Sequence, residues 1–159
     1  MAKALSIIGG IGSWVSIPLP WWSASSSLGL SVSLSLASLE SLSRGIELRP
    51  GVTLSLQPEL VAGVQAAFAL ILLGGILGVT GGVSSKRVLE AVGGLLTIIG
   101  IVAFLYGLIS LGKGTWILGG SFGLLGLSVQ WGVSYGILVA GISAILMLAS
   151  SSRKPLPHR

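Results

Sequence analysis

Four long apolar segments constrain the possible folds of this chain more than any other feature. They cover about residues 4–22, 60–83, 88–112 and 131–149. Each reaches the ~20 residues that a helix rising about 1.5 Å per residue needs to cross about 30 Å of hydrocarbon. Hydrocarbon offers a backbone amide no hydrogen-bond partner, so each segment is expected to be helical. Only 8% of the residues are charged, against about 25% in soluble domains, which indicates an integral membrane protein.

The first segment allows a second interpretation. Lys3, the apolar run after it and the small residues at 23–25 also resemble a secretory signal peptide. Because the segment is long enough to span a bilayer, we favour a retained helix. Pro18 and Pro20 are expected to end or kink this helix, since proline lacks the amide hydrogen that an interior helical position needs.

The charged residues predict the orientation of the helices. Basic residues flank the apolar segments near the N-terminus, at Lys86 and Arg87, and in the tail 151–159. The positive-inside rule places such residues in the cytoplasm. Both termini are therefore expected on the cytoplasmic side of the plasma membrane, and residues 23–59 and 113–130 on the outer side. The same rule accounts for the net charge of +5 without nucleic acid, which we do not expect as a partner. Four tryptophans would then anchor the outer interface: Trp21, Trp22, Trp116 and Trp131.

The two predicted outer loops share a two-residue period. In LGLSVSLSL, residues 28–36, leucine or valine alternates with serine or glycine, and the alternation returns around Pro50-Gly51 and in LLGLSVQW, residues 124–131. A period of two indicates strands with one apolar and one polar face. We predict one small sheet from both loops, with its apolar face covered by the helix ends. Its outward serines form a candidate assembly surface: Ser31, Ser33 and Ser35.

Glycine recurs at spacings of four and seven residues along the apolar segments. Small residues let helix backbones approach closely, and close packing is a main source of helix attraction in lipid. We expect these stripes to pack helices within one chain, although one stripe facing another copy is the alternative. The predicted helix-packing positions are Gly74, Gly78, Gly82, Gly93, Gly100, Gly107, Gly132 and Gly136.

The sequence contains no recognisable catalytic set. Cysteine and aspartate are absent, and the only histidine, His158, lies in the polar tail. A thiolate nucleophile, a Ser-His-Asp triad and a histidine metal cluster are therefore excluded. The runs GGIG and GGILG lack the GK[ST] ending of a phosphate-binding loop. We predict a protein that is not an enzyme and has no cofactor.

One ionisable residue and one long neutral polar residue lie well inside the predicted spans, where ionisable groups are functional by default. Glu90 lies about one turn into its segment, where it can reach the cytoplasmic interface or pair with Lys86 or Arg87. Gln65 can make an interhelical hydrogen bond or line a path. We favour structural roles for both residues, and a transport path is the alternative.

The complete pattern predicts a four-transmembrane-helix bundle with a small extracellular antiparallel β-sheet cap, in one membrane domain over residues 1–150 followed by a basic cytoplasmic tail. This topology, with its short basic inner turn SSKR, resembles the claudin and peripheral-myelin-protein superfamily. The resemblance covers nearly the whole chain as topology, without the family's Trp, Gly-Leu-Trp and two-cysteine motif. It implies a structural role in cell–cell or lateral membrane assemblies, or an auxiliary role beside a channel.

The predicted function is therefore that of a non-enzymatic tetraspan protein in a lateral or cell-surface assembly, or of an accessory subunit in a larger membrane complex. The alternatives are a small transporter or channel subunit, and a subunit that lends helices to a membrane enzyme. The expected partners are the lipid bilayer and either further copies of the chain or the larger complex.

Overall fold

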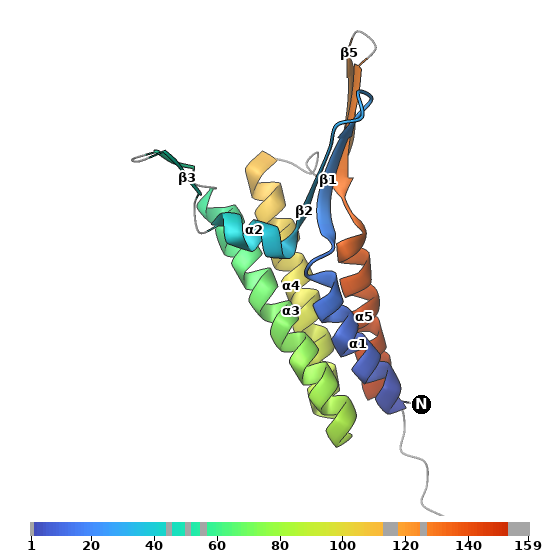
Figure 1. Ribbon diagram of the computed structural model, residues 1–159. Helices are drawn as coiled ribbons and strands as arrows, with labels where there is room; N and C mark the ends of the chain where they lie inside the picture. The colour runs from blue at the N-terminus through green and yellow to red at the C-terminus, as the bar shows by residue number, and fades with distance from the viewer. Residues whose placement is uncertain are drawn as a thin grey trace, which may run out of the picture.

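Four helices packed side by side and a sheet projecting from one end of them make up the fold (Figure 1). The computed structural model describes residues 2–43, 46–49, 52–54, 57–112, 118–124 and 127–152. The elements, in order, are α1 (Ala2–Ser16), β1 (Pro20–Ser26), β2 (Ser31–Ser35), α2 (Leu36–Ser43), β3 (Ile46–Arg49), β4 (Val52–Leu54), α3 (Pro58–Ser84), α4 (Arg87–Gly112), β5 (Gly119–Leu124), β6 (Leu127–Val133) and α5 (Tyr135–Ser151).

The helices α1, α3, α4 and α5 form what we call the helix bundle, in which packed neighbours run antiparallel (Figure 1). The start of α1, the turn between α3 and α4, and the end of α5 lie at one end, which we call the terminal end. The sheet, α2 and the β3–β4 hairpin lie at the other, the sheet end.

Two helices in the described part of the chain are long and apolar enough to cross a membrane: Pro58–Ser84 and Arg87–Ser110. The other two are shorter, since α1 has 15 residues and α5 has 17. At about 1.5 Å per residue they extend about 22 and 26 Å, less than the ~30 Å of a hydrocarbon core. By length and composition, α3 and α4 are thus the candidate membrane spans.

Two predicted helix boundaries are wrong at the sheet end. The helix expected over 4–22 ends at Ser16, and the helix expected over 131–149 begins at Tyr135, because residues 20–26 and 127–133 are paired strands. Pro18 and Pro20 provide the reason for the first ending, since neither has an amide hydrogen to continue the helix. The second reflects the two-residue period of LSVQWGV, which continues to Val133 and matches a strand.

One antiparallel sheet combines strands from both loops that connect the long helices, as the shared period predicted. Its strand order is β2-β1-β6-β5. Within it Trp22 lies opposite Leu34 and Val133, and Ala24 lies opposite Val32 and Trp131. The sheet extends away from the sheet end of the bundle (Figure 1).

The stretch 28–36 is only partly a strand. Residues 28–30 belong to the turn between β1 and β2, where Gly29 has a φ of 80°, a left-handed conformation that glycine adopts without steric cost. Leu36 begins α2, which the alternation did not predict. The strands β3 and β4 form a separate two-stranded sheet, so the expectation of one sheet from all the alternating stretches is wrong for them. Pro50-Gly51 lies outside the described residues.

The helix α2 begins with a reciprocal pair of serine hydrogen bonds. The amide of Ser38 donates to Oγ of Ser35 over 3.1 Å, and the amide of Ser35 donates to Oγ of Ser38 over 2.9 Å. This is the capping-box geometry, with serine where glutamate or glutamine usually stands. Both amides at the start of the helix are thus satisfied.

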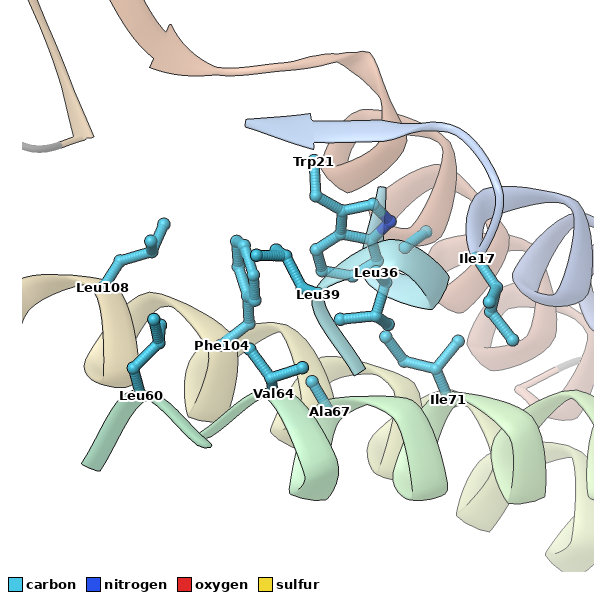
Figure 2. Packing of buried hydrophobic residues seen from close by; sticks show 11 residues of the cluster. Ile17, Trp21, Leu36, Leu39, Leu60, Val64, Ala67, Ile71, Phe104 and Leu108 are labelled. Carbon is cyan, nitrogen blue, oxygen red and sulfur yellow. The ribbon is translucent and has the colours of Figure 1, made fainter. Parts of the chain in front are cut away.

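The large buried side chains gather at the sheet end of the bundle. Figure 2 shows Trp21, Leu36, Ile71 and Phe104 pointing toward one another from β1, α2, α3 and α4. The rings of Trp21 and Phe104 meet edge to face, with centroids 5.0 Å apart and an interplanar angle of 77°. Such a pair contributes beyond its buried area because the ring edge is positive and the ring face negative.

Candidate functional site

The four-stranded sheet has two chemically different faces. Residues opposite each other in an antiparallel pair point to the same side, so the register assigns each side chain to a face. What we call the apolar face carries Trp22, Ala24, Val32, Leu34, Phe122, Val129, Trp131 and Val133, with Ser26 as a polar member. The opposite side, the serine face, carries Ser23, Ser25, Ser31, Ser33, Ser121, Ser128 and Gln130.

Much of the apolar face is exposed. The exposed fractions are 58% for Phe122, 57% for Val32, 43% for Val133 and 37% for Val129. Only the base of the face is covered, where the half-buried side chains of Trp22 and Leu34 pack against the buried core. The sheet therefore presents apolar side chains where a folded chain would normally bury them.

The prediction that the helix ends cover this apolar face is therefore wrong for most of the stretch 28–36. Leu36 is buried and Leu34 half-buried, but Leu28, Leu30 and Val32 are 67%, 70% and 57% exposed. The physical reason is the orientation of β2, which lies along the direction of the bundle and returns to it at Ser35, so that the strand does not cross the bundle end (Figure 1). The sheet projects from the bundle and does not cover the ends of the helices.

The predicted interface tryptophans have different environments. Trp21 is fully buried, and its Nε1 donates to the carbonyl oxygen of Ser16 over 2.7 Å, so its ring is not at a membrane surface. A bulge between Pro20 and Trp22 separates Trp21 from the regular alternation of β1. Trp22 lies on the apolar face, and Trp116 lies outside the described residues.

Trp131 lies on the apolar face and covers the neighbouring strand. A Cβ atom placed on Gly120 would lie 2.8 Å from Cζ2 of Trp131, so the indole ring lies directly over that glycine. An aromatic ring that covers a glycine on the next strand protects backbone that would otherwise be exposed. The ring thereby adds apolar surface over both β5 and β6.

The serine face provides hydroxyl groups but no charge. Ser31 and Ser33 are exposed. Ser35, the third member of the predicted assembly surface, instead uses its hydroxyl in the cap of α2, where it also contacts Oγ of Ser38 at 3.0 Å. The four strands of the sheet contain no acidic or basic residue. Neither face is therefore suited to binding an ion by charge.

Seven of the eight predicted glycines lie on helices, at points where another element approaches closely. A Cβ on Gly74 would lie 2.7 Å from the carbonyl oxygen of Gly93, and one on Gly82 would lie 2.9 Å from that of Lys3. The remaining positions of this set, each facing another element of the same chain, are Gly78, Gly93, Gly100, Gly107 and Gly136. The neighbours are thus intramolecular.

Gly132 is the exception among the predicted helix-packing glycines. It lies in β6, opposite Gly119 of β5 and Ser23 of β1. Its position in a strand follows from the length of β6 and the later start of α5. It packs within the sheet and not between helices.

Gln65 and Glu90 do not form a common site. Gln65 is exposed on α3 toward the sheet end, whereas Glu90 lies in the first turn of α4 at the terminal end and is only 4% exposed. No ion pair or hydrogen bond joins the Glu90 side chain to Lys86 or Arg87, all three of which the structure describes. Its carbon chain turns instead toward α3, where a Cβ on Gly81 would lie 2.8 Å from Cγ of Glu90.

Other features of the described residues offer no reactive chemistry. No group of three His, Cys, Asp or Glu side chains among them is placed to hold a metal ion. A groove of about 410 Å³ between α1 and α3 is lined by apolar side chains: Trp14, Ile17, Pro18, Phe68, Leu72 and Ile76. Nε1 of Trp14 already donates to the carbonyl oxygen of Leu72 over 3.2 Å. The exposed sheet is therefore the most distinctive surface of the described chain.

Comparison with known proteins gives no family for this chain. Neither the protein-family models nor the curated proteins include a match.

Proposed function

We propose that this chain is a non-enzymatic membrane protein whose four-helix bundle lies in the plasma membrane and whose sheet binds another protein in a lateral or cell-surface assembly. The observation that carries the proposal is the exposed apolar face, with Val32 and Phe122 more than half exposed. Contiguous exposed apolar patches on folded proteins mark interaction sites, because leaving them in water is unfavourable.

The distribution of charge supports the proposed orientation. The elements at the terminal end carry Lys3, Lys86 and Arg87 against one acid, Glu90, whereas α2, β3 and the start of α3 at the sheet end carry Glu40, Glu47 and Glu59 against one base, Arg49. With basic residues in the cytoplasm, both termini are inside and the sheet is outside. The resemblance to the claudin topology implies the same kind of assembly role.

A transport path receives less support than an assembly role. A path needs polar groups aligned along one side of the bundle, yet Gln65 and Glu90 lie toward opposite ends and on different helices. The close glycine contacts between α3 and α4 leave little space between these helices. The bundle is therefore better suited to holding the sheet than to conducting a solute.

Two lysine substitutions on adjacent residues of β2 test the proposal. Val32→Lys places a charge on the apolar face, and Ser33→Lys places the same charge on the serine face. Both side chains are exposed, so both variants should fold with nearly unchanged melting temperatures, as expected of surface substitutions. Chemical cross-linking in native membranes should show a loss of the cross-linked complex for Val32→Lys and its retention for Ser33→Lys.

One outcome of this experiment would contradict the proposal. A cross-linking pattern identical to that of the parent chain in both variants would show that the sheet is not a binding surface. Ser35 is not used, because a substitution there would remove the cap of α2 as well as change the surface.

A further inference from the structure

We infer that the edge strand β5 pairs with an extended, uncharged segment of another membrane protein, which adds to the sheet as a fifth strand. This inference rests on the proposed function: the partner covers the apolar face, and the added strand fixes its position. The strand order β2-β1-β6-β5 leaves β2 and β5 as the two edges of the sheet. An edge strand presents backbone N–H and C=O groups with which a strand of another chain can pair.

The hydrogen-bond register shows which backbone groups of β5 point away from the sheet. In an antiparallel ladder, alternate residues bond to the strand on one side, and the residues between them point to the other side. The amide of Ser134, directly after β6, donates to the carbonyl oxygen of Trp21 over 2.9 Å. The amide of Ser27 donates to the carbonyl oxygen of Ser128 over 2.8 Å. Even-numbered residues of β6 therefore bond to β1, and its odd-numbered residues bond to β5.

Three residues of β5 consequently direct their N–H and C=O groups to the free edge. They are Gly119, Ser121 and Gly123, which lie opposite the even-numbered Gly132, Gln130 and Ser128. All three are exposed, and their backbone groups have no hydrogen-bond partner in the part of the chain that the structure describes. The edge thus offers an incoming strand three donors and three acceptors.

The opposite edge of the sheet is less available. The strand β2 is followed at once by α2, and the amide of its last residue, Ser35, already donates to Oγ of Ser38. Among the described elements, by contrast, β5 packs extensively only against β6. It has no charged residue, proline or bulge, which are the usual features that protect an edge. The edge at β5 is therefore the one suited to strand addition.

The residues of β5 also allow another backbone to come close. Its outward positions carry nothing larger than the hydroxymethyl group of Ser121. The ring of Trp131 accounts for Gly120, but a Cβ on Gly119 would meet its nearest atom at an ordinary 3.7 Å. Packing within the chain therefore gives no reason for glycine at 119. Glycine in a strand often marks a place where another backbone approaches closely.

The sheet defines the direction of the added strand. Every pair in it is antiparallel, and β5 runs away from the bundle because its partner β6 leads into α5. An antiparallel strand on β5 therefore runs toward the membrane, where it can continue into a helix as β6 does. The β5 strands of two upright copies in one membrane run in the same direction, so β5 of a second copy does not provide this strand.

The sheet also defines the side chains of the added strand. Alternate side chains would lie beside Phe122 on the apolar face and beside Ser121 on the serine face. No strand of the sheet has a charged residue that could pair with a charge on the partner. The fitting segment is uncharged and alternates apolar with small polar side chains.

A capped synthetic peptide with the sequence of β6, LSVQWGV, is the probe, because it has this alternation and no charge. Ser121→Pro removes one outward N–H group and no bond to β6, a position where an edge strand tolerates proline. Ser121→Ala keeps the amide and is the control. Fluorescence anisotropy with the full-length chain in lipid nanodiscs should give a Kd about ten-fold higher, or more, for Ser121→Pro than for Ser121→Ala.

Methylated peptides test the same contact on the unaltered chain. Two versions carry N-methyl groups on the odd-numbered or on the even-numbered amides. Since only one set of amides faces β5 in a paired strand, one version should lose binding and the other should keep it. Equal binding of both versions, or no binding of the unmethylated peptide, would overturn the inference, as would equal affinities of the two Ser121 variants.

The native complex separates this inference from the proposed function. Cross-linking in native membranes should show loss of the complex for Ser121→Pro and its retention for Ser121→Ala. Retention in both, with loss in Val32→Lys, would overturn the edge contact alone and keep the sheet as a binding surface. Differently tagged copies that co-purify, and no longer do so with Ser121→Pro, would show that the partner is a second copy and not another protein.

Discussion

The two ends of the helix bundle pack by different means. Toward the terminal end the backbones nearly touch: a Cβ on Gly10 would lie 2.7 Å from the carbonyl oxygen of Gly75, and one on Gly93 would lie 2.8 Å from the amide nitrogen of Gly78. Toward the sheet end α3 and α4 still meet at a glycine, since a Cβ on Gly63 would lie 2.7 Å from the carbonyl oxygen of Ala103. Large side chains, among them Trp21 and Phe104, both fully buried, fill the space between these two helices and the elements beside them. We call these regions the glycine region and the aromatic region.

The difference follows from where α1 ends. In the glycine region all four helices are present and meet directly. Beyond Ser16, α3 and α4 continue without α1, and β1 and α2 take its place (Figure 1). There Trp21 of β1 and Leu36 of α2 fill the space beside α3 and α4. Packing mode thus depends on which elements are neighbours and not on the overall apolar composition.

Removing the largest side chain of the aromatic region should have the largest effect. Trp21→Ala deletes a fully buried indole, its contact with Phe104 and its hydrogen bond to Ser16. We expect a loss of about 3–5 kcal/mol in the free energy of unfolding, as for other buried aromatics. Denaturant unfolding in detergent measures it. The control is Trp22→Ala, whose half-buried ring should cost clearly less, and equal losses would contradict the distinction between the two tryptophans.

Adding a single methyl group should disrupt the helix packing of the glycine region and lower the stability of the protein. A Cβ at Gly93 would meet backbone atoms of Gly74 and Gly78, which cannot rotate away as a side chain can. Gly93→Ala is expected to cost about 1–3 kcal/mol through overpacking. Melting temperature in detergent provides the measurement.

Gly141→Ala is the matched control for Gly93→Ala. Gly141 also lies in a helix, but nothing lies within 4 Å of a Cβ placed there. The change should be neutral or stabilise by up to about 1 kcal/mol, because alanine favours the helix over glycine. A similar loss at both positions would show that close backbone contact is not what the glycines provide.

The smallest expected effect concerns a hydrogen bond within the glycine region. Oγ of Ser6 donates across helices to the carbonyl oxygen of Gly78 over 2.7 Å, and Ser6 is fully buried. Ser6→Ala should cost about 1 kcal/mol, the net value of a typical hydrogen bond. Ser84→Ala serves as control, since that exposed hydroxyl bonds only within its own helix. A melting temperature lowered equally in both variants would argue against a role for Ser6 between the helices.

The sequence predicted the long helices well because their signal is uniform. The expected ranges 60–83 and 88–112 correspond to Pro58–Ser84 and Arg87–Gly112. Both are apolar along most of their length, and Pro58 at the first turn lacks an amide that would have been unpaired there in any case. Length and hydropathy were sufficient for these two elements.

Elements near the sheet end were harder to predict. The strand β1 follows an apolar helix without a polar break, so PWWSASS resembles the end of that helix. The start of α2 was hidden because its cap uses serine in a region already rich in serine. Periodicity identified the two faces of β2 but did not predict which of its side chains are buried. Burial depends on how the strand is oriented relative to the bundle.

The position of Trp21 has a mechanical consequence. Its indole donates to Ser16 at the end of α1, its carbonyl oxygen accepts from the amide of Ser134 over 2.9 Å, and its ring packs on Gly136 at the start of α5. These contacts leave no hinge between the sheet and the two helices that are connected to it, α1 and α5. A force that tilts the sheet is therefore transmitted as torque to α1 and α5 together, and through these two helices to the rest of the bundle.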